Sequence, residues 1–386
     1  MVLFVFILNT FYVYLTCLKI SFTNMKTKII GIAIVLLLGG SLVWHNQTKQ
    51  DTFRIGALLC LTAPCEEWGE NSLDGIMLAA EEINASGGIL GKQIEIVVED
   101  SAEDNIANSV NAYKALRSKN IEYIIGPTWS AAGQALGPIA AKDKVLITSP
   151  SLGVRDFNEA GTNIFNIWPH DELATRALAK FAFEKGHRKI AIVSSKESWY
   201  LVQGNAFEDE FVKLGGTVLI KDEIPTDRTD VRTDAAKIFA LKPDLIAYSN
   251  FENMGLVAHE LSVLGYTGAQ VSVLMDESRI DQGRGAFEGT VLVQYAKPSQ
   301  EFINAYKNKF GKEPGITADT GYDALKIYAQ IINEAGRDDL SEVNKIFADL
   351  KTYPGASGEL TFDGKGGVTK PPVFYVVKGT QFVEYK

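Results

Sequence analysis

Hydrophobic and polar positions follow two alternating periods along the chain after residue 52. Short apolar runs typical of buried strands are each followed by a longer stretch in which apolar residues recur every three or four positions, as in an amphipathic helix. The first strand is FRIGALL (53–59), and the first helix is NSLDGIMLAAEEINASGG (71–88), which ends at Gly87 and Gly88. This alternation predicts parallel βαβ units with helices on both faces of a sheet.

The same pattern restarts after Pro169, so the sequence predicts two lobes of the α/β class, each with a doubly wound parallel sheet and a cleft between them. A strand-rich tail closes the chain. The remaining predicted strands are 94–100, 121–126, 144–149, 189–195, 217–224, 244–250 and 270–276, and the remaining predicted helices are 171–185, 200–214, 231–241, 253–264, 299–310 and 317–335.

Loops after the strands are the expected place for a ligand, because open α/β sheets bind ligands beyond the carboxyl ends of their strands. These loops are rich in hydroxyl, aromatic and glycine residues, with a few acids, which suits a small polar molecule with an apolar part. They are 62–68, 126–130, 149–153, 195–200, 249–252 and 276–278.

Ser130 stands where a helix is predicted to begin, in TWSAAG. Its hydroxyl and the free N–H groups of the first helical turn can together accept a carboxylate. An ordinary N-cap is the alternative. A catalytic nucleophile is the weakest interpretation, because the sequence lacks a Gly-x-Ser-x-Gly elbow and none of the four histidines has the context of a base.

Two other kinds of side chain occupy these loops. Asp276 and Glu277 follow a predicted strand and can meet a ligand cation, although a solvated turn would also contain such acids. The aromatic residues can cover an apolar group or offer a cation–π face, and each alone fits a core position equally well. They are Trp68, Trp199, Tyr200 and Phe251. No phosphate loop or metal-ligand spacing is present, so we expect no cofactor and no metal.

The N-terminal segment differs from the rest. The apolar run 29–44 follows Met25, Lys26 and Lys28, which is typical of a secretory signal or a short membrane anchor and predicts an exported body. A second apolar run at 2–18 favours a true start at Met25. Residues 1–52 carry a net charge of +3 and the whole chain carries −9, so the remaining residues carry −12. An acidic body repels phosphate backbones, so nucleic acid is not an expected partner.

Cys60 and Cys65, in CLTAPC, can form a disulfide in an oxidising compartment, and two unpaired thiols are the open alternative.

The stretch from Gly75 to Gly91 contains G-x-x-L-A-x-x-x-I-N-x-x-G-G-I-x-G, which resembles the opening motif of type I periplasmic binding proteins, especially the leucine/isoleucine/valine-binding receptors of ABC transporters. The likeness continues through IIGPTWSAAGQALGPIAAKDKVLITSPS and TADTGYDALKIYAQII. It implies two lobes joined by a multi-strand hinge, one made of 53–168 with 297–370 and the other of 169–296 with 371–386.

The resemblance also implies a set of ligand-binding residues. Ser130 would bind an amino-acid carboxylate and Glu277 the ammonium group, while Ser151 would offer backbone contacts. Aromatic residues would complete the site, and Gly153 replaces a threonine that amino-acid binders carry, which removes one hydroxyl. The expected set is Trp68, Ser130, Ser151, Gly153, Trp199, Phe251 and Glu277.

The family resemblance implies an exported, non-enzymatic receptor, periplasmic or at the cell surface, where its N-terminal segment could tether it. It would be a monomer that passes a small ligand to an ABC permease. A membrane-tethered sensor on the same fold is the alternative. The missing hydroxyl at Gly153, together with Ala131 and Ala132, indicates a ligand that differs from a standard α-amino acid.

Overall fold

The computed structural model describes residues 51–63, 65–103 and 105–386. The chain divides into Met1–Asp51 and Thr52–Lys386, and both predicted lobes belong to the second unit. The predicted signal or anchor segment at 29–44 and the alternative start at Met25 lie outside the described residues. Across the three described ranges, no helix is both long and apolar enough to cross a membrane.

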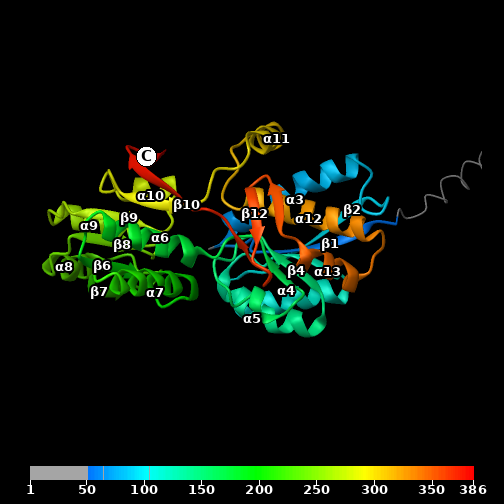
Figure 1. Cartoon of the computed structure of the whole chain (residues 1–386), viewed down its shortest axis with the longest axis horizontal. Helices are drawn as coiled ribbons and strands as arrows, with labels where there is room; N and C mark the ends of the chain where they lie inside the picture. Colours follow the sequence, from blue (N-terminus) through cyan, green and yellow to red (C-terminus); the bar gives the residue numbers. More distant parts are fainter. Residues whose placement is uncertain (1–50, 64, 104) are drawn as a thin grey trace, which may run out of the picture. The chain divides into compact units, whose positions relative to one another are not determined.

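The first lobe is built on a five-stranded parallel sheet with the order β2-β1-β3-β4-β5. Its strands are β1 (Phe53–Leu59), β2 (Ile94–Asp100), β3 (Tyr123–Ile125), β4 (Leu146–Ser149) and β5 (Ile164–Asn166). Helices α3 (Glu66–Ala85), α12 (Ala318–Ala335) and α13 (Leu340–Asp349) cover one face, and α4 (Ile106–Ser118) and α5 (Ser130–Asp143) cover the other (Figure 1).

The second lobe contains a seven-stranded sheet with the order β15-β14-β10-β9-β8-β6-β7. Strands β6 (Lys189–Ser194), β7 (Thr217–Glu223), β8 (Leu245–Tyr248), β9 (Ala269–Ser272) and β10 (Val291–Gln294) are parallel, while β14 (Val373–Lys378) and β15 (Gln381–Glu384) add antiparallel strands at one edge. Helices α6 (Asp171–Glu184) and α7 (Ser198–Lys213) pack on one face, and α8 (Arg232–Ala240), α9 (Met254–Val263) and α10 (Glu277–Gln282) pack on the other.

The chain passes between these sheets at 167–170, 295–299 and 370–372. After the second passage, α11 (Gln300–Phe310) packs against α3, and a small sheet of β11 (Thr352–Gly355), β12 (Gly358–Phe362) and β13 (Val368–Thr369) joins the first lobe. A short 3-10 helix, η1 (Asn158–Ala160), lies before β5. The α/β class with two doubly wound parallel-sheet lobes is therefore confirmed.

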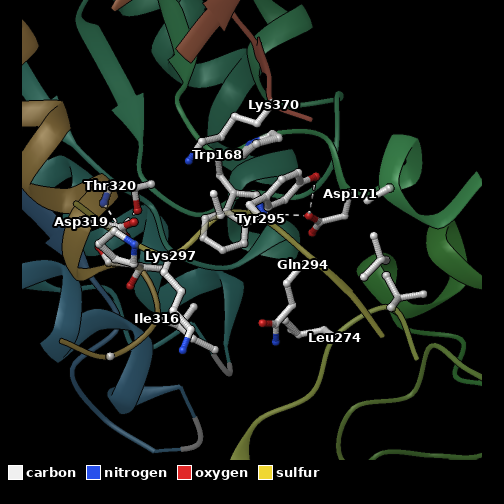
Figure 2. Close-up of a pocket in the computed structure, with 18 of the residues that line it drawn as sticks. Trp168, Asp171, Leu274, Gln294, Tyr295, Lys297, Ile316, Asp319, Thr320 and Lys370 are labelled. Atoms are coloured by element: carbon white, nitrogen blue, oxygen red, sulfur yellow. Dashed lines mark hydrogen bonds between the residues drawn. The ribbon is translucent and has the colours of Figure 1, made fainter. Parts of the chain in front are cut away.

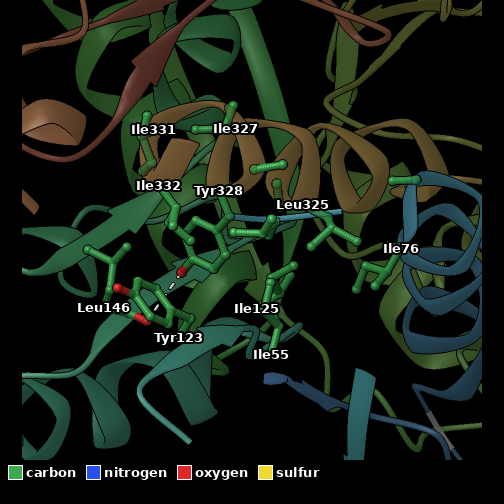
Figure 3. Packing of buried hydrophobic residues seen from close by; sticks show 14 of the residues in the cluster. Ile55, Ile76, Tyr123, Ile125, Leu146, Leu325, Ile327, Tyr328, Ile331 and Ile332 are labelled. Carbon is green, nitrogen blue, oxygen red and sulfur yellow. Dashed lines mark hydrogen bonds between the residues drawn. The ribbon is translucent and has the colours of Figure 1, made fainter. Parts of the chain in front are cut away.

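The core of the first lobe forms where α12 lies across the strands (Figure 3). Ile327 and Leu325 on this helix are fully buried, because its apolar stripe faces Ile55 and the other strand residues. Tyr328 is also fully buried, and its hydroxyl donates to the carbonyls of Ile124 (2.8 Å) and Leu146 (3.2 Å). These hydrogen bonds satisfy the hydroxyl group, so the tyrosine can be buried without an unpaired polar atom.

Two glycines of the sequence motif have identifiable structural roles. A Cβ on Gly75 would lie 1.8 Å from the carbonyl oxygen of Ala318, so glycine permits the close approach of α3 to α12. Gly88 has a φ of +79°, and its N–H donates to the carbonyl of Ile83 at the end of α3. Glycine is the residue that adopts this left-handed conformation without strain.

Two predicted boundaries differ from the structure in ways that affect the site. Helix α3 begins at Glu66, not at residue 71, so Trp68 lies on the first turn of a helix and not in a loop. Strand β9 ends at Ser272, not at residue 276, because Asp276 caps α10 by accepting the N–H of Arg279 (2.9 Å). Glu277 is therefore the first residue of a short helix.

Candidate ligand-binding site

A cavity of about 430 Å³ lies between the lobes, at the carboxyl ends of strands from both sheets. Five of the seven residues expected to bind a ligand line it: Trp68, Ser130, Ser151, Trp199 and Phe251. Gly153 and Glu277 are not among the lining residues. The first lobe contributes hydroxyl groups, the start of α5, two tryptophans and Glu103, and the second lobe contributes mainly aromatic and acidic side chains.

Helix α5 presents its N-terminus to this cavity. The helix starts at Ser130, and its first internal hydrogen bond runs from Gly133 N–H to the Trp129 carbonyl (3.0 Å). The three preceding N–H groups, of residues 130–132, have no partner in the part of the chain that the structure describes and are available to a ligand. The Ser130 side chain is buried, and its hydroxyl has no hydrogen-bond partner among the described residues. These groups together can accept an anion such as a carboxylate.

Glu103, which no sequence motif indicated, fixes the segment just before this helix. Its Oε1 accepts from Thr128 N–H (2.9 Å) and from the Ser101 hydroxyl (2.7 Å), and its Oε2 accepts from Trp129 N–H. Burial raises the pKa of Glu103, and the hydrogen bonds oppose that effect. The carboxylate therefore positions the start of α5 from a distant part of the sequence.

Ser151 and Gly153 shape the neighbouring loop. The Ser151 hydroxyl donates to the Thr128 carbonyl (2.6 Å), which ties the loop after β4 to the segment before α5. A Cβ on Gly153 would lie 2.0 Å from Asp171 Oδ2 and 2.5 Å from Trp199 Nε1. A side chain here, such as the threonine expected in amino-acid binders, would therefore require Asp171 or Trp199 to shift.

Asp171 lies at the junction of the two lobes. Its Oδ1 accepts from Trp168 Nε1 (2.9 Å) and from the Tyr295 hydroxyl (3.5 Å), and its Oδ2 accepts from Trp199 Nε1 (2.7 Å). Burial raises the pKa of Asp171 to about 6, and these hydrogen bonds limit the shift. Asp171 therefore connects two of the inter-lobe passages with the wall of the ligand cavity.

A second, smaller cavity of about 200 Å³ lies beyond Asp171, lined by residues of both lobes and of the passages between them (Figure 2). Figure 2 shows Tyr295 next to Asp171, with Lys370 and Asp319 on other sides of the space. The Lys370 ammonium lies 6.0 Å from the centre of the Tyr295 ring. Burial lowers the pKa of Lys370 and raises that of Asp319.

The wall from the second lobe is aromatic and acidic. The rings of Trp199 and Tyr200 meet edge to face, with centroids 5.4 Å apart. Phe251 lies under the guanidinium of Arg279, whose Cζ is 4.4 Å from the ring centre, and Arg279 also pairs with Glu252 (3.1 Å). No group of three or more potential metal ligands is found within the described ranges.

Glu277, expected to meet an ammonium group, has an exposed side chain and lies outside the cavity lining. Helix α10 begins where a strand end was predicted, so Glu277 sits on a helix and not directly beyond the sheet edge. Its contact with a ligand ammonium group stays a prediction.

A protein-family comparison matches residues 52–380 to the family described as periplasmic binding protein. The chain belongs to the periplasmic binding protein family. This match confirms the resemblance drawn from the sequence motifs.

Among curated relatives of this periplasmic binding protein is the Leu/Ile/Val-binding protein BraC3 of Rhizobium johnstonii, 23% identical over 326 residues, with 82% of this chain and 88% of the relative covered. A leucine-binding protein of Thermotoga maritima has a similar fold, with a TM-score of 0.80, 24% identity and coverage of 87% and 98%. An ABC-transporter solute-binding protein of Rhodopseudomonas palustris in complex with 3,4-dihydroxybenzoic acid gives a TM-score of 0.77, 19% identity and coverage of 87% and 96%.

In this periplasmic binding protein, Cys60 and Cys65 form a disulfide with a Cα–Cα distance of 5.7 Å, which decides between the two alternatives that the sequence left open. The bridge closes the loop between β1 and α3. Cys60 N–H also donates to the Thr128 hydroxyl (3.0 Å), so the bridged loop contacts the segment that leads to Ser130. The disulfide therefore lies next to the turn that carries Trp68.

Proposed function

We propose that the protein is an exported receptor that captures an amino acid or a similar small organic molecule between its two lobes and delivers it to an ABC permease. The observation that carries this proposal is the cavity of about 430 Å³ lined by both lobes. A molecule that contacts both walls favours the closed arrangement of the lobes, and closure creates the state that a permease can recognise. The names of the related proteins support the ligand class.

The lobe boundaries are part of the proposal. We assign 53–168 with 297–370 to the first lobe and 169–296 with 371–386 to the second. The distribution of strands supports this division, because β1 to β5 pair in one sheet and β6 to β10 pair with β14 and β15 in another. The three passages at 167–170, 295–299 and 370–372 would then act as the hinge.

Ser130 holds the ligand in this proposal and does not attack it. A nucleophilic serine needs a base within hydrogen-bond reach. Among the described residues that line the cavity there is no histidine, and the buried His170 contacts Asn158 (3.0 Å) instead. The free N–H groups of α5 and the Ser130 hydroxyl suit a carboxylate or carbonyl oxygen of the ligand.

Export and monomeric state complete the proposal. The Cys60–Cys65 disulfide is typical of an oxidising compartment outside the cytoplasm. Both walls of the cavity come from one chain, so a single copy is sufficient to bind ligand. Analytical ultracentrifugation of the full chain in detergent should give the mass of one copy.

The experiment that tests the function is a thermal-unfolding screen of the full chain against amino acids, amides, amines and short carboxylates. A ligand at 100 times its dissociation constant stabilises the folded state by about 2.7 kcal/mol, which is a measurable shift in melting temperature. Ser130→Ala should reduce the shift, and Ser341→Ala, at an exposed position on α13, is the matched control. If no member of these classes shifts the melting temperature, the proposal is wrong.

A further inference from the structure

The cavity between the lobes is strongly acidic. Four carboxylates line it, Glu103, Asp171, Glu197 and Glu252, and no Lys, Arg or His is present among its described lining residues. Among the described residues, only Glu252 of these four has a cationic partner, the Arg279 guanidinium at 3.1 Å. The lining therefore contains more acidic than basic side chains.

The other three carboxylates interact with neutral donors. Glu103 accepts from hydroxyl and backbone N–H groups, and Asp171 accepts from two indoles and a phenol. Glu197 accepts from the Thr226 hydroxyl (2.6 Å) and has no ion-pair partner among the described residues. Neutral donors stabilise a carboxylate without cancelling its charge, so a cation that enters the cavity gains an attraction that a neutral molecule lacks.

Aromatic rings line the same space from both lobes. They belong to Trp68, Trp129, Trp199, Tyr200 and Phe251. Phe251 already holds a cation, because the Arg279 guanidinium lies over its ring. Ring faces attract ammonium groups, most strongly for tryptophan, and methylated ammonium ions are the cations that such aromatic sites recognise best.

The groups that can hold an anion are few by comparison. Glu103 already occupies the N–H groups of Thr128 and Trp129. Alanines at 131 and 132 add no hydroxyl, and the position of Gly153 leaves no space for one. What remains is the Ser130 hydroxyl and the first-turn N–H groups of α5, enough for one oxygen-bearing group.

We propose that the receptor selects ligands with a net positive charge, whose ammonium or methylated ammonium group lies among the aromatic rings and faces Glu197 and Asp171. A hydroxyl, amide or carbonyl oxygen at the other end of the ligand contacts Ser130. This inference rests on the proposed function of the cavity and names the ligand class within it. The selectivity differs from that of a receptor for zwitterionic leucine or for an aromatic carboxylate.

The test is a set of ligands that differ in charge but have almost the same shape. Leucinamide is cationic, leucine is zwitterionic, 4-methylpentanamide is neutral and 4-methylpentanoate is anionic. Choline and its uncharged isostere 3,3-dimethylbutan-1-ol form a second pair for the methylated group. Binding to the full chain in detergent is measured by calorimetry at about pH 6.5, below the usual α-amino pKa of about 7.7.

We expect the cation to bind at least about tenfold more tightly than its neutral isostere in at least one pair, and more tightly than leucine. Any other order overturns the inference. If leucine or 4-methylpentanoate binds more tightly than both cations, the inference fails and the proposed receptor function stands. If nothing in this series or in the wider screen binds, both fail.

Variants then identify the side chains that cause the preference for cationic ligands. Glu197→Gln should weaken binding of the cation about twofold to fivefold and leave the neutral isostere unchanged. Glu260→Gln, on α9 of the same lobe and outside the lining, is the matched control. Trp68→Leu should weaken choline more than Trp68→Phe does, because phenylalanine keeps a ring face. An equal loss for cation and neutral isostere in Glu197→Gln would contradict the role of charge.

Discussion

Asp171 makes the stability of this protein depend on pH in a predictable direction. Asp171 is 9% exposed as a residue, and its carboxylate receives three hydrogen bonds, from Trp168, Trp199 and Tyr295. Burial raises its pKa from an ordinary value of 3.8 to about 6. The perturbation that isolates its effect is Asp171→Asn, which keeps a similar shape and removes the ionisable group.

The size of the effect follows from the difference between the folded and unfolded pKa. A difference of about two pH units corresponds to about 3 kcal/mol. Because the folded pKa is raised, the folded protein binds the proton more tightly than the unfolded chain does. The resulting stabilisation is fully present below about pH 4 and is lost as the pH rises through about 6.

The assay is urea unfolding of the full chain at pH 4, 5, 6 and 7, for the wild type and Asp171→Asn. Other buried acids, such as Asp323, contribute equally to both proteins, so the difference between the two pH profiles reports Asp171. We expect the free energy of unfolding of the wild type to fall by about 2.5 kcal/mol more than that of the variant between pH 4 and 7. Asp349→Asn, at an exposed position on α13, should follow the wild type. Parallel profiles for the wild type and Asp171→Asn would refute the reasoning.

Two further predictions concern stability. Ile327→Ala removes a fully buried side chain between α12 and the first sheet and should lower the free energy of unfolding by about 2–5 kcal/mol in urea titrations. Gln330→Ala, exposed on the same helix, should change it by about 0.5 kcal/mol or less. Equal effects of the two substitutions would show that Ile327 is not a core residue. The double variant Cys60→Ser, Cys65→Ser should have a free energy of unfolding lower by about 2 kcal/mol, because the disulfide closes only a short loop. Reductant should cause the same loss in the wild type. No change in either experiment would mean that the disulfide does not form in solution.

Much of the architecture could be predicted from local pattern. Strands β1 and β2 were predicted with the bounds that the structure has, because β1 is a short, mostly apolar run and the apolar residues of β2 are enriched in Ile and Val. Gly87 and Gly88 indicated the helix end that the structure has, while the close packing of α3 against α12 at Gly75 is known only from the structure. Strands β5 and β10 were not predicted.

The candidate site was predicted only in part. Ser130, Trp199 and Phe251 follow strands directly, so the rule that ligands bind beyond strand ends was sufficient to find them. Glu277 followed a predicted strand end that the structure does not have. Glu103 and Glu197 are ordinary loop acids in the sequence, and nothing local marks them as neighbours across a cavity.

The sequence by itself determined the alternation of strands and helices and the two lobes, because these depend on short-range periodicity. It also determined the family and most of the hydroxyl and aromatic residues of the candidate site, because these depend on local motifs. Only the tertiary structure decided which acids face the cavity, that Asp171 joins the passages between the lobes, and that Gly153 has no space for a side chain. These features arise from contacts between residues far apart in the chain. Burial and charge at such contacts are set by the packing of the whole lobe, so no local pattern encodes them.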